Sequence, residues 1–102
     1  MTIWADADSL PREARELIAR RCKPGGPAAV FVANRPVPLP PGPSLTALVV
    51  GAADGAADGY IMDNARRGDL VVTRDIPLAA RLVDAGIVAI NDRGDIWNDG
   101  TV

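Results

Sequence analysis

Histidine is absent from this chain of 102 residues, and cysteine and lysine each occur once, as Cys22 and Lys23. A single cysteine excludes an internal disulfide and a cluster of thiolate metal ligands. Without histidine, the usual ligand set of a zinc site is missing as well. The chain's ionic chemistry must therefore come from 13 acidic residues and from basic residues that, apart from Lys23, are all arginine.

No run of about 20 apolar residues is present that could span a bilayer. Asp6 and Asp8 interrupt the apolar stretch that a secretory signal would need near the amino terminus, so we expect a cytoplasmic protein without a membrane partner. The formal net charge of −2 argues against tight nonspecific binding of nucleic acid, because phosphate contacts draw on clustered cations. Length and a hydrophobic content of 48% predict one domain over residues 1–102 with a single core.

Short segments that are almost continuously apolar predict parallel strands covered on both faces. They are residues 2–5, 28–33, 45–50, 70–73 and 88–90. Helical patterns occupy residues 11–22, 57–68 and 76–86, and the last two end on Gly68 and Gly86, residues typical of a helix stop. The order predicts an α/β fold of three layers, with a mostly parallel central sheet of about five strands and helices on both faces.

One connection departs from this alternation of strands and helices. The five prolines within residues 34–44 forbid a regular helix there. We therefore expect an extended loop between the second and third strands, serving either as a rigid connection or as a substrate flap.

Aspartates follow two of the predicted strands directly. Asp6 and Asp8 come after the first strand, and Asp75 comes after the fourth. If these strands are parallel neighbours, their carboxylates gather at the edge where open α/β sheets bind ligands, and Asp58 can join them from the start of a helix. Crowded carboxylates raise one another's pKa and oppose folding unless protons, arginines or a metal compensate. The pattern predicts a site for a hard divalent cation, Mg²⁺ or Mn²⁺, at these four residues.

A plainer interpretation exists for three of the aspartates, because aspartate is common at helix starts. Asp8, Asp58 and Asp75 could each cap the helix that follows. Independent caps, however, need not converge on one edge of a sheet, and convergence is what distinguishes a metal site from separate caps.

Four polar residues flank the aspartates and are candidates for substrate binding. The hydroxyls of Ser9 and Thr73 could hydrogen-bond a metal-bound water or a phosphate. Arg74 and Arg93 could contact phosphates as well, since guanidinium binds them through two parallel hydrogen bonds. Ordinary surface charge is the alternative interpretation of both arginines.

The stretches "TIWADADSLP", "GDLVVTRDIPLAARLVDAG" and "INDRG" resemble the YaiI/YqxD family of bacterial proteins, which belongs to the PIN-like nuclease superfamily. The resemblance implies a PIN-like domain that cleaves RNA or related phosphodiesters with Mg²⁺ or Mn²⁺, a metal-bound water attacking the phosphorus. It further implies that Asp6, Asp8, Asp58 and Asp75 are the catalytic metal ligands.

The chain also departs from the family's pattern. Ser9 and Leu10 stand where family members usually carry alanine and cysteine, and Gly55 stands at an expected acidic position, with Asp54 one residue earlier. Family members continue into a further helical and basic segment beyond the position of Val102. We expect the lack of that segment to uncover part of the sheet or to remove contacts with nucleic acid, and to leave room for a homodimer.

Two other functions stay open at this point. A noncatalytic module would keep the acidic edge without turnover and bind RNA or another protein. The stretch "DADSL" also resembles the haloacid-dehalogenase signature, which would make Asp6 a phosphoryl-accepting nucleophile. Such enzymes need a lysine beside the phosphoryl group, and Lys23 follows the first predicted helix, away from the carboxyl edge.

Overall fold

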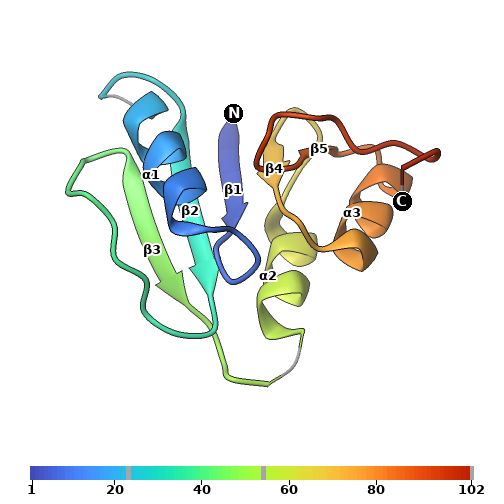
Figure 1. Cartoon of the computed structure of the whole chain (residues 1–102), viewed down its shortest axis with the longest axis horizontal. Helices are drawn as coiled ribbons and strands as arrows, with labels where there is room; N and C mark the ends of the chain where they lie inside the picture. Colours follow the sequence, from blue (N-terminus) through green and yellow to red (C-terminus); the bar gives the residue numbers. More distant parts are fainter. Residues whose placement is uncertain (23, 54, 102) are drawn as a thin grey trace.

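A computed structural model describes residues 1–22, 24–53 and 55–101 of the chain (Figure 1). Its elements follow in the order β1 (Thr2–Asp6), α1 (Arg12–Arg21), β2 (Ala28–Ala33), β3 (Leu45–Val49), α2 (Ala56–Asn64), β4 (Leu70–Val72), α3 (Ile76–Asp84) and β5 (Val88–Ile90). Lys23 and Asp54 lie outside the described residues, so the expectations attached to them stay expectations.

The described strands form a single parallel sheet of five strands in the order β3-β2-β1-β4-β5. Each predicted strand is present, and its boundaries differ from the prediction by at most one residue. The predicted α/β fold with a central parallel sheet is thereby confirmed. β1 lies in the middle, paired with β2 on one side and with β4 on the other.

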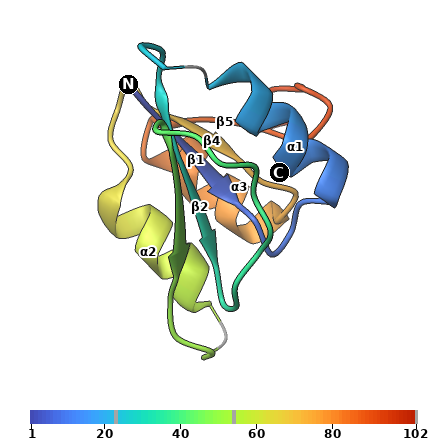
Figure 2. The same cartoon turned by 90° about the vertical axis from the view of Figure 1, so that its left-hand side faces the viewer.

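Side chains that alternate along the strands divide the core into two layers. On one face, Ala5, Phe31 and Val72 pack with residues of α1. On the other face, Val32 and Val71 pack with residues of α2 and α3. Figure 2 shows α1 and α2 on opposite sides of the sheet. Right-handed connections require this arrangement, because the chain crosses the sheet in one direction through α1 and in the opposite direction through α2 and α3.

Of the two helix ends predicted at glycines, the one at Gly86 is confirmed and the one at Gly68 is wrong. Gly86, with a φ of 76°, ends α3 as predicted: its N–H donates to the carbonyl of Val83, and the next N–H, of Ile87, donates to that of Leu82. The stop predicted at Gly68 is wrong, because α2 ends at Asn64 and Gly68 lies in the turn before β4. No helix within the described ranges is long and apolar enough to cross a bilayer.

The proline-rich connection, residues 34–44, contains no helix, as its five prolines predicted. Its apolar side chains Val37 and Leu39 pack against the layer that contains α1. The loop therefore takes the place of a second helix on this face, beside β2 and β3.

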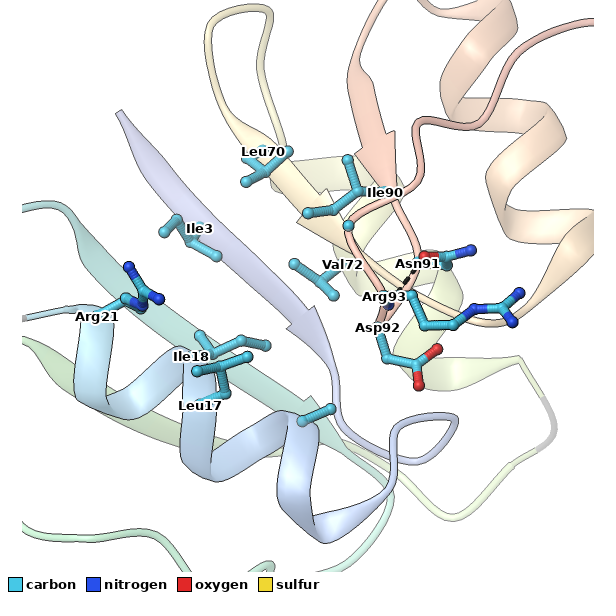
Figure 3. A pocket seen from close by; sticks show the side chains of 12 residues that line it. Ile3, Leu17, Ile18, Arg21, Leu70, Val72, Ile90, Asn91, Asp92 and Arg93 are labelled. Atoms are coloured by element: carbon cyan, nitrogen blue, oxygen red, sulfur yellow. Dashed lines mark hydrogen bonds between the residues drawn. The ribbon is translucent and has the colours of Figure 1, made fainter.

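The same face is left open over β4 and β5. An apolar groove of about 310 Å³ lies between α1 and these strands. Figure 3 shows Leu17 and Ile18 of α1 on one side of it and Leu70 and Ile90 of the strands on the other. Parallel strands are usually covered on both faces, yet Val88 of β5 is 50% exposed. Among the helices that the structure describes, only α1 packs on this face.

Candidate metal site

The carboxyl ends of β1 and β4 form the switch point of the sheet, where the chain's connections diverge to opposite sides. Trp4 pairs with Val71 and Ala5 with Val72, so the next residues, Asp6 and Thr73, stand side by side. Open parallel sheets bind ligands at such a point, outside the carboxyl ends of the strands. The convergence expected for the aspartates can therefore be checked at this edge.

Three of the four predicted aspartates meet there. One carboxylate oxygen from each of Asp6, Asp58 and Asp75 lies within 4.8 Å of the other two. Asp6 ends β1, Asp58 lies in the first turn of α2, and Asp75 is the N-cap of α3. The amino ends of both helices stabilise negative charge at this place. Asp75 also caps α3, because its Oδ1 accepts the N–H of Leu78 at 2.9 Å, so capping and convergence coexist in one residue.

The three carboxylates open on a cavity of about 230 Å³. Its walls consist of Asp6, Asp8, Ser9, Asn34, Gly55, Ala57, Asp58 and Asp75. None of these described wall residues is basic, so the cavity concentrates negative charge without a neutralising side chain in its wall.

Hydroxyl groups hold Asp6 in place. Thr73, which is fully buried, donates from Oγ1 to Asp6 Oδ2 at 2.7 Å and accepts the N–H of Asp75 at 3.0 Å. Ser9 Oγ donates to the backbone carbonyl of Asp6 at 3.2 Å and accepts the N–H of Arg74 at 3.0 Å. Both hydroxyls thus tie the ends of β1 and β4 together. The sequence suggested substrate contacts for them and missed this positioning role.

Burial and mutual repulsion raise the pKa values of two of the carboxyl groups. For Asp6, burial raises the pKa and outweighs the opposing hydrogen bonds from Thr73 and Ser9, while Asp75 and Asp8 raise it further. For Asp58, burial, the charges of Asp75 and Asp6, and a hydrogen bond with Asp75 raise the pKa to about 6, against a smaller opposite effect of Arg81. The cluster therefore resists carrying its full negative charge without a counter-ion.

Asp8 stands apart from the cluster of three, although it lines the same cavity. Its side chain is exposed, and Oδ2 accepts the backbone N–H of Asn34 at 2.8 Å. Asp8 does not cap α1 either, since the N-cap is Pro11 and has no side-chain cap bond. The structure thus assigns Asp8 a contact that neither interpretation of the sequence foresaw.

Asn34 is a wall residue that the sequence reasoning did not single out. It directly follows β2, and the rule that located Asp6 and Asp75 at strand ends would have located it too. Its Oδ1 is buried, and within the described part of the chain no group donates a hydrogen bond to it. An unpaired buried acceptor costs about 1–3 kcal/mol, so this atom calls for a partner.

Together these features fit a metal ion. Three carboxylates and an unpaired amide oxygen are hard oxygen donors, and the described walls offer no cation of their own. The cluster of Asp6, Asp58 and Asp75 could therefore hold a metal ion.

The two arginines suggested for substrate binding lie beside this cavity rather than in it. Arg74 and Arg93 line a neighbouring cavity of about 250 Å³ together with Trp97. Arg74 Nε is 3.4 Å from Asp92 Oδ1, and the two arginine side chains are 56% and 80% exposed. Both guanidinium groups therefore remain accessible from solvent.

Residues 4–102 match the model of a protein family described as "Uncharacterized BCR, YaiI/YqxD family". A Treponema pallidum (strain Nichols) protein named "UPF0178 protein" is 50% identical over 102 residues, which are the whole of this chain and 58% of that protein. A protein of the same name from Psychromonas ingrahamii is 42% identical over 102 residues, again the whole of this chain and 68% of that protein. A third, from Treponema denticola, is 46% identical over 97 residues, or 95% of this chain and 61% of that protein.

No solved structure matches the chain. The chain spans between 58% and 68% of the length of these three relatives. The family match extends over nearly the whole chain and includes the residues of the acidic cluster. The chain belongs to the YaiI/YqxD family.

Proposed function

We propose that this protein is a metal-dependent hydrolase of phosphodiester bonds that uses Mg²⁺ or Mn²⁺ and acts on RNA. The observation that carries the proposal is the convergence of Asp6, Asp58 and Asp75, from three different elements, on one cavity whose described walls contain no basic residue. The resemblance to PIN-like nucleases supports the same activity. Buried, crowded carboxylates favour a hard divalent cation over a softer one.

Asp6, Asp58 and Asp75 would hold the cation. When bound, a divalent cation supplies Lewis acidity toward a phosphate oxygen and makes a nucleophile of water at neutral pH. Thr73 and Ser9 keep Asp6 oriented through the hydrogen bonds described above. No side chain needs to act as a nucleophile. Asp6 is 2% exposed with Oδ2 held by Thr73, which disfavours the phosphoryl-accepting role that "DADSL" suggested.

RNA would lie along the carboxyl edge, from the acidic cavity toward Arg74 and Arg93. Their exposed guanidinium groups are suited to phosphates on either side of the bond that is cut. Because the net charge is −2, we expect this contact to be local and modest rather than a broad basic surface.

Binding of Mn²⁺ tests the proposal before any substrate is known. We expect Mn²⁺ to raise the melting temperature of the protein, and Asp75→Asn to abolish most of the increase. A single-stranded RNA oligonucleotide should be cleaved in the presence of Mn²⁺ by the wild type and not by the variant. Identical melting curves with and without Mn²⁺ would remove the chemical basis of the proposal. Binding of Mn²⁺ without cleavage of RNA would favour the noncatalytic module.

A further inference from the structure

The end of β2 brings a neutral side chain to the acidic cavity. β2 pairs in parallel with β1, with Val32 opposite Asp6, so Asn34 lies just past the carboxyl end of the neighbouring strand. The N–H of Ala7 donates to the carbonyl of Val32 at 3.0 Å and locks the two strand ends together. Asn34 therefore shares a wall with the acidic cluster through the geometry of the sheet itself.

Asp8 fixes the backbone at this position. Its Oδ2 accepts the N–H of Asn34 at 2.8 Å, so the main chain of Asn34 cannot swing away from the cavity without breaking a bond to a carboxylate. The preceding residue, Ala33, is buried in the layer that contains α1. Asn34 is thus held through its own N–H group and through the buried residue before it, although it begins a proline-rich loop.

The side-chain amide oxygen of Asn34 lacks a hydrogen-bond donor within the described part of the chain. Oδ1 is buried, and no described donor reaches it. The carboxylates of the wall cannot satisfy it in their charged form, because ionised carboxylates only accept hydrogen bonds. The hydroxyl of Ser9, also in the wall, already donates its proton to the backbone carbonyl of Asp6. A cation is the kind of partner that attracts the carboxylates and the amide oxygen alike, and divalent hard cations accept asparagine carbonyls as ligands.

We propose that Asn34 belongs to the cation site and supplies a neutral oxygen to it through Oδ1, while Asp8 acts as a positioning residue that holds Asn34. This inference rests on the proposed function, since it requires that Asp6, Asp58 and Asp75 bind a cation. A neutral ligand adds coordination without adding a fourth charge to a cluster in which carboxylates already repel one another. In this arrangement Asp8 contributes from outside the cluster, through its hydrogen bond to the backbone of Asn34.

The test measures Mn²⁺ binding to the full chain by electron paramagnetic resonance of the free ion, and the unfolding of the cation-free protein in urea. Asn34→Ala should raise the Kd for Mn²⁺ by about tenfold or more, the loss typical of removing a supporting group from a metal site. Cation-free Asn34→Ala should be no less stable than the wild type, because the lost oxygen had no described partner. The matched control Asn64→Ala, at the far end of α2, should leave the Kd unchanged within about twofold.

Asn34→Asp distinguishes two roles of the side chain, that of an oxygen ligand and that of an amide that donates hydrogen bonds. It keeps the oxygen and the shape, so Mn²⁺ should bind at least as tightly as to the wild type. Loss of binding in Asn34→Asp, or unchanged binding in Asn34→Ala, would overturn the role of Asn34 while leaving the three-aspartate site intact. Absence of Mn²⁺ binding in the wild type would refute the proposed function, and the role of Asn34 with it.

Discussion

Replacing Asp58 by asparagine removes a carboxylate whose pKa rises from 3.8 to about 6 in the folded protein. A pKa raised on folding means that the folded state binds the proton more tightly, so the contribution of Asp58 to stability is present below pH 3.8 and is lost as pH rises through about 6. The full shift corresponds to about 3 kcal/mol. Because Asp58 is only half-buried, solvent screening reduces this to about 1–2 kcal/mol.

We therefore expect cation-free Asp58→Asn to be more stable than the wild type at pH 8, by about 1–2 kcal/mol, and equally stable near pH 4. Urea unfolding between pH 4 and 8, followed by circular dichroism in the presence of a chelator, measures both limits. Asp63→Asn is a suitable control, since Asp63 is an exposed aspartate of the same helix outside the cavity. It should show no comparable pH-dependent difference.

A divalent cation should make the wild type more stable than Asp58→Asn at pH 8, the reverse of the order expected without the cation. At a Mn²⁺ concentration about 1,000 times its Kd, binding adds about 4 kcal/mol to the wild type. If losing the Asp58 carboxylate weakens binding about 100-fold, the variant gains about 2.7 kcal/mol less, which exceeds its advantage without the cation. Cation-free Asp58→Asn that is less stable than the wild type at pH 8 would refute the view that the carboxylates crowd one another.

Two further substitutions probe contacts that support the site and the sheet. Thr73→Val keeps the shape of the side chain but leaves Asp6 Oδ2 without its buried hydrogen-bond donor. The free energy of unfolding at pH 7, measured by urea denaturation, should therefore fall by about 2 kcal/mol. An unchanged value would contradict the positioning role of Thr73. Asp69 accepts the N–H groups of Thr2, Trp4 and Arg66, and although its burial opposes the effect, these bonds lower its pKa. Asp69→Asn should therefore lower the free energy of unfolding by about 1–2 kcal/mol at pH 7, measured by tryptophan fluorescence. This loss should shrink as acid protonates the wild-type carboxylate below pH 3.8. An equal cost at every pH would show that the charge of Asp69 is irrelevant.

The fold was predictable because its signals are local. Continuous apolar runs such as residues 28–33 are typical of buried parallel strands, and the prolines of residues 34–44 exclude a helix. Gly86 marks the end of α3 because the chain needs a positive φ there. The helix stop predicted at Gly68 was wrong although Gly68 also has a positive φ, because this residue lies in a turn four residues beyond the end of α2. Glycine reports a backbone conformation and not the element that requires it.

The acidic site was only partly predictable, because its members are distant in sequence. A single rule, that ligands gather outside the carboxyl ends of parallel strands, led to Asp6 and Asp75. The hydrogen bond from Thr73 to Asp6 joins residues 67 positions apart, and no local pattern reveals which hydroxyl meets which carboxylate. The same holds for the bond between Asp8 and Asn34, which links the loop after β1 to the end of β2.

The open half of the sheet and the acidic site follow from one topological choice. The chain moves from β1 to β2 and β3 on one side, then returns past β1 to β4 and β5 on the other. Right-handed connections must then change faces, so α2 and α3 both cover the face opposite α1. That change of faces brings the amino ends of α2 and α3 to the side on which Asp6 lies, and their first turns carry Asp58 and Asp75 to it. The same change leaves β4 and β5 without a helix on the α1 face in the described structure, so the exposed groove there is the consequence of the arrangement that assembles the site.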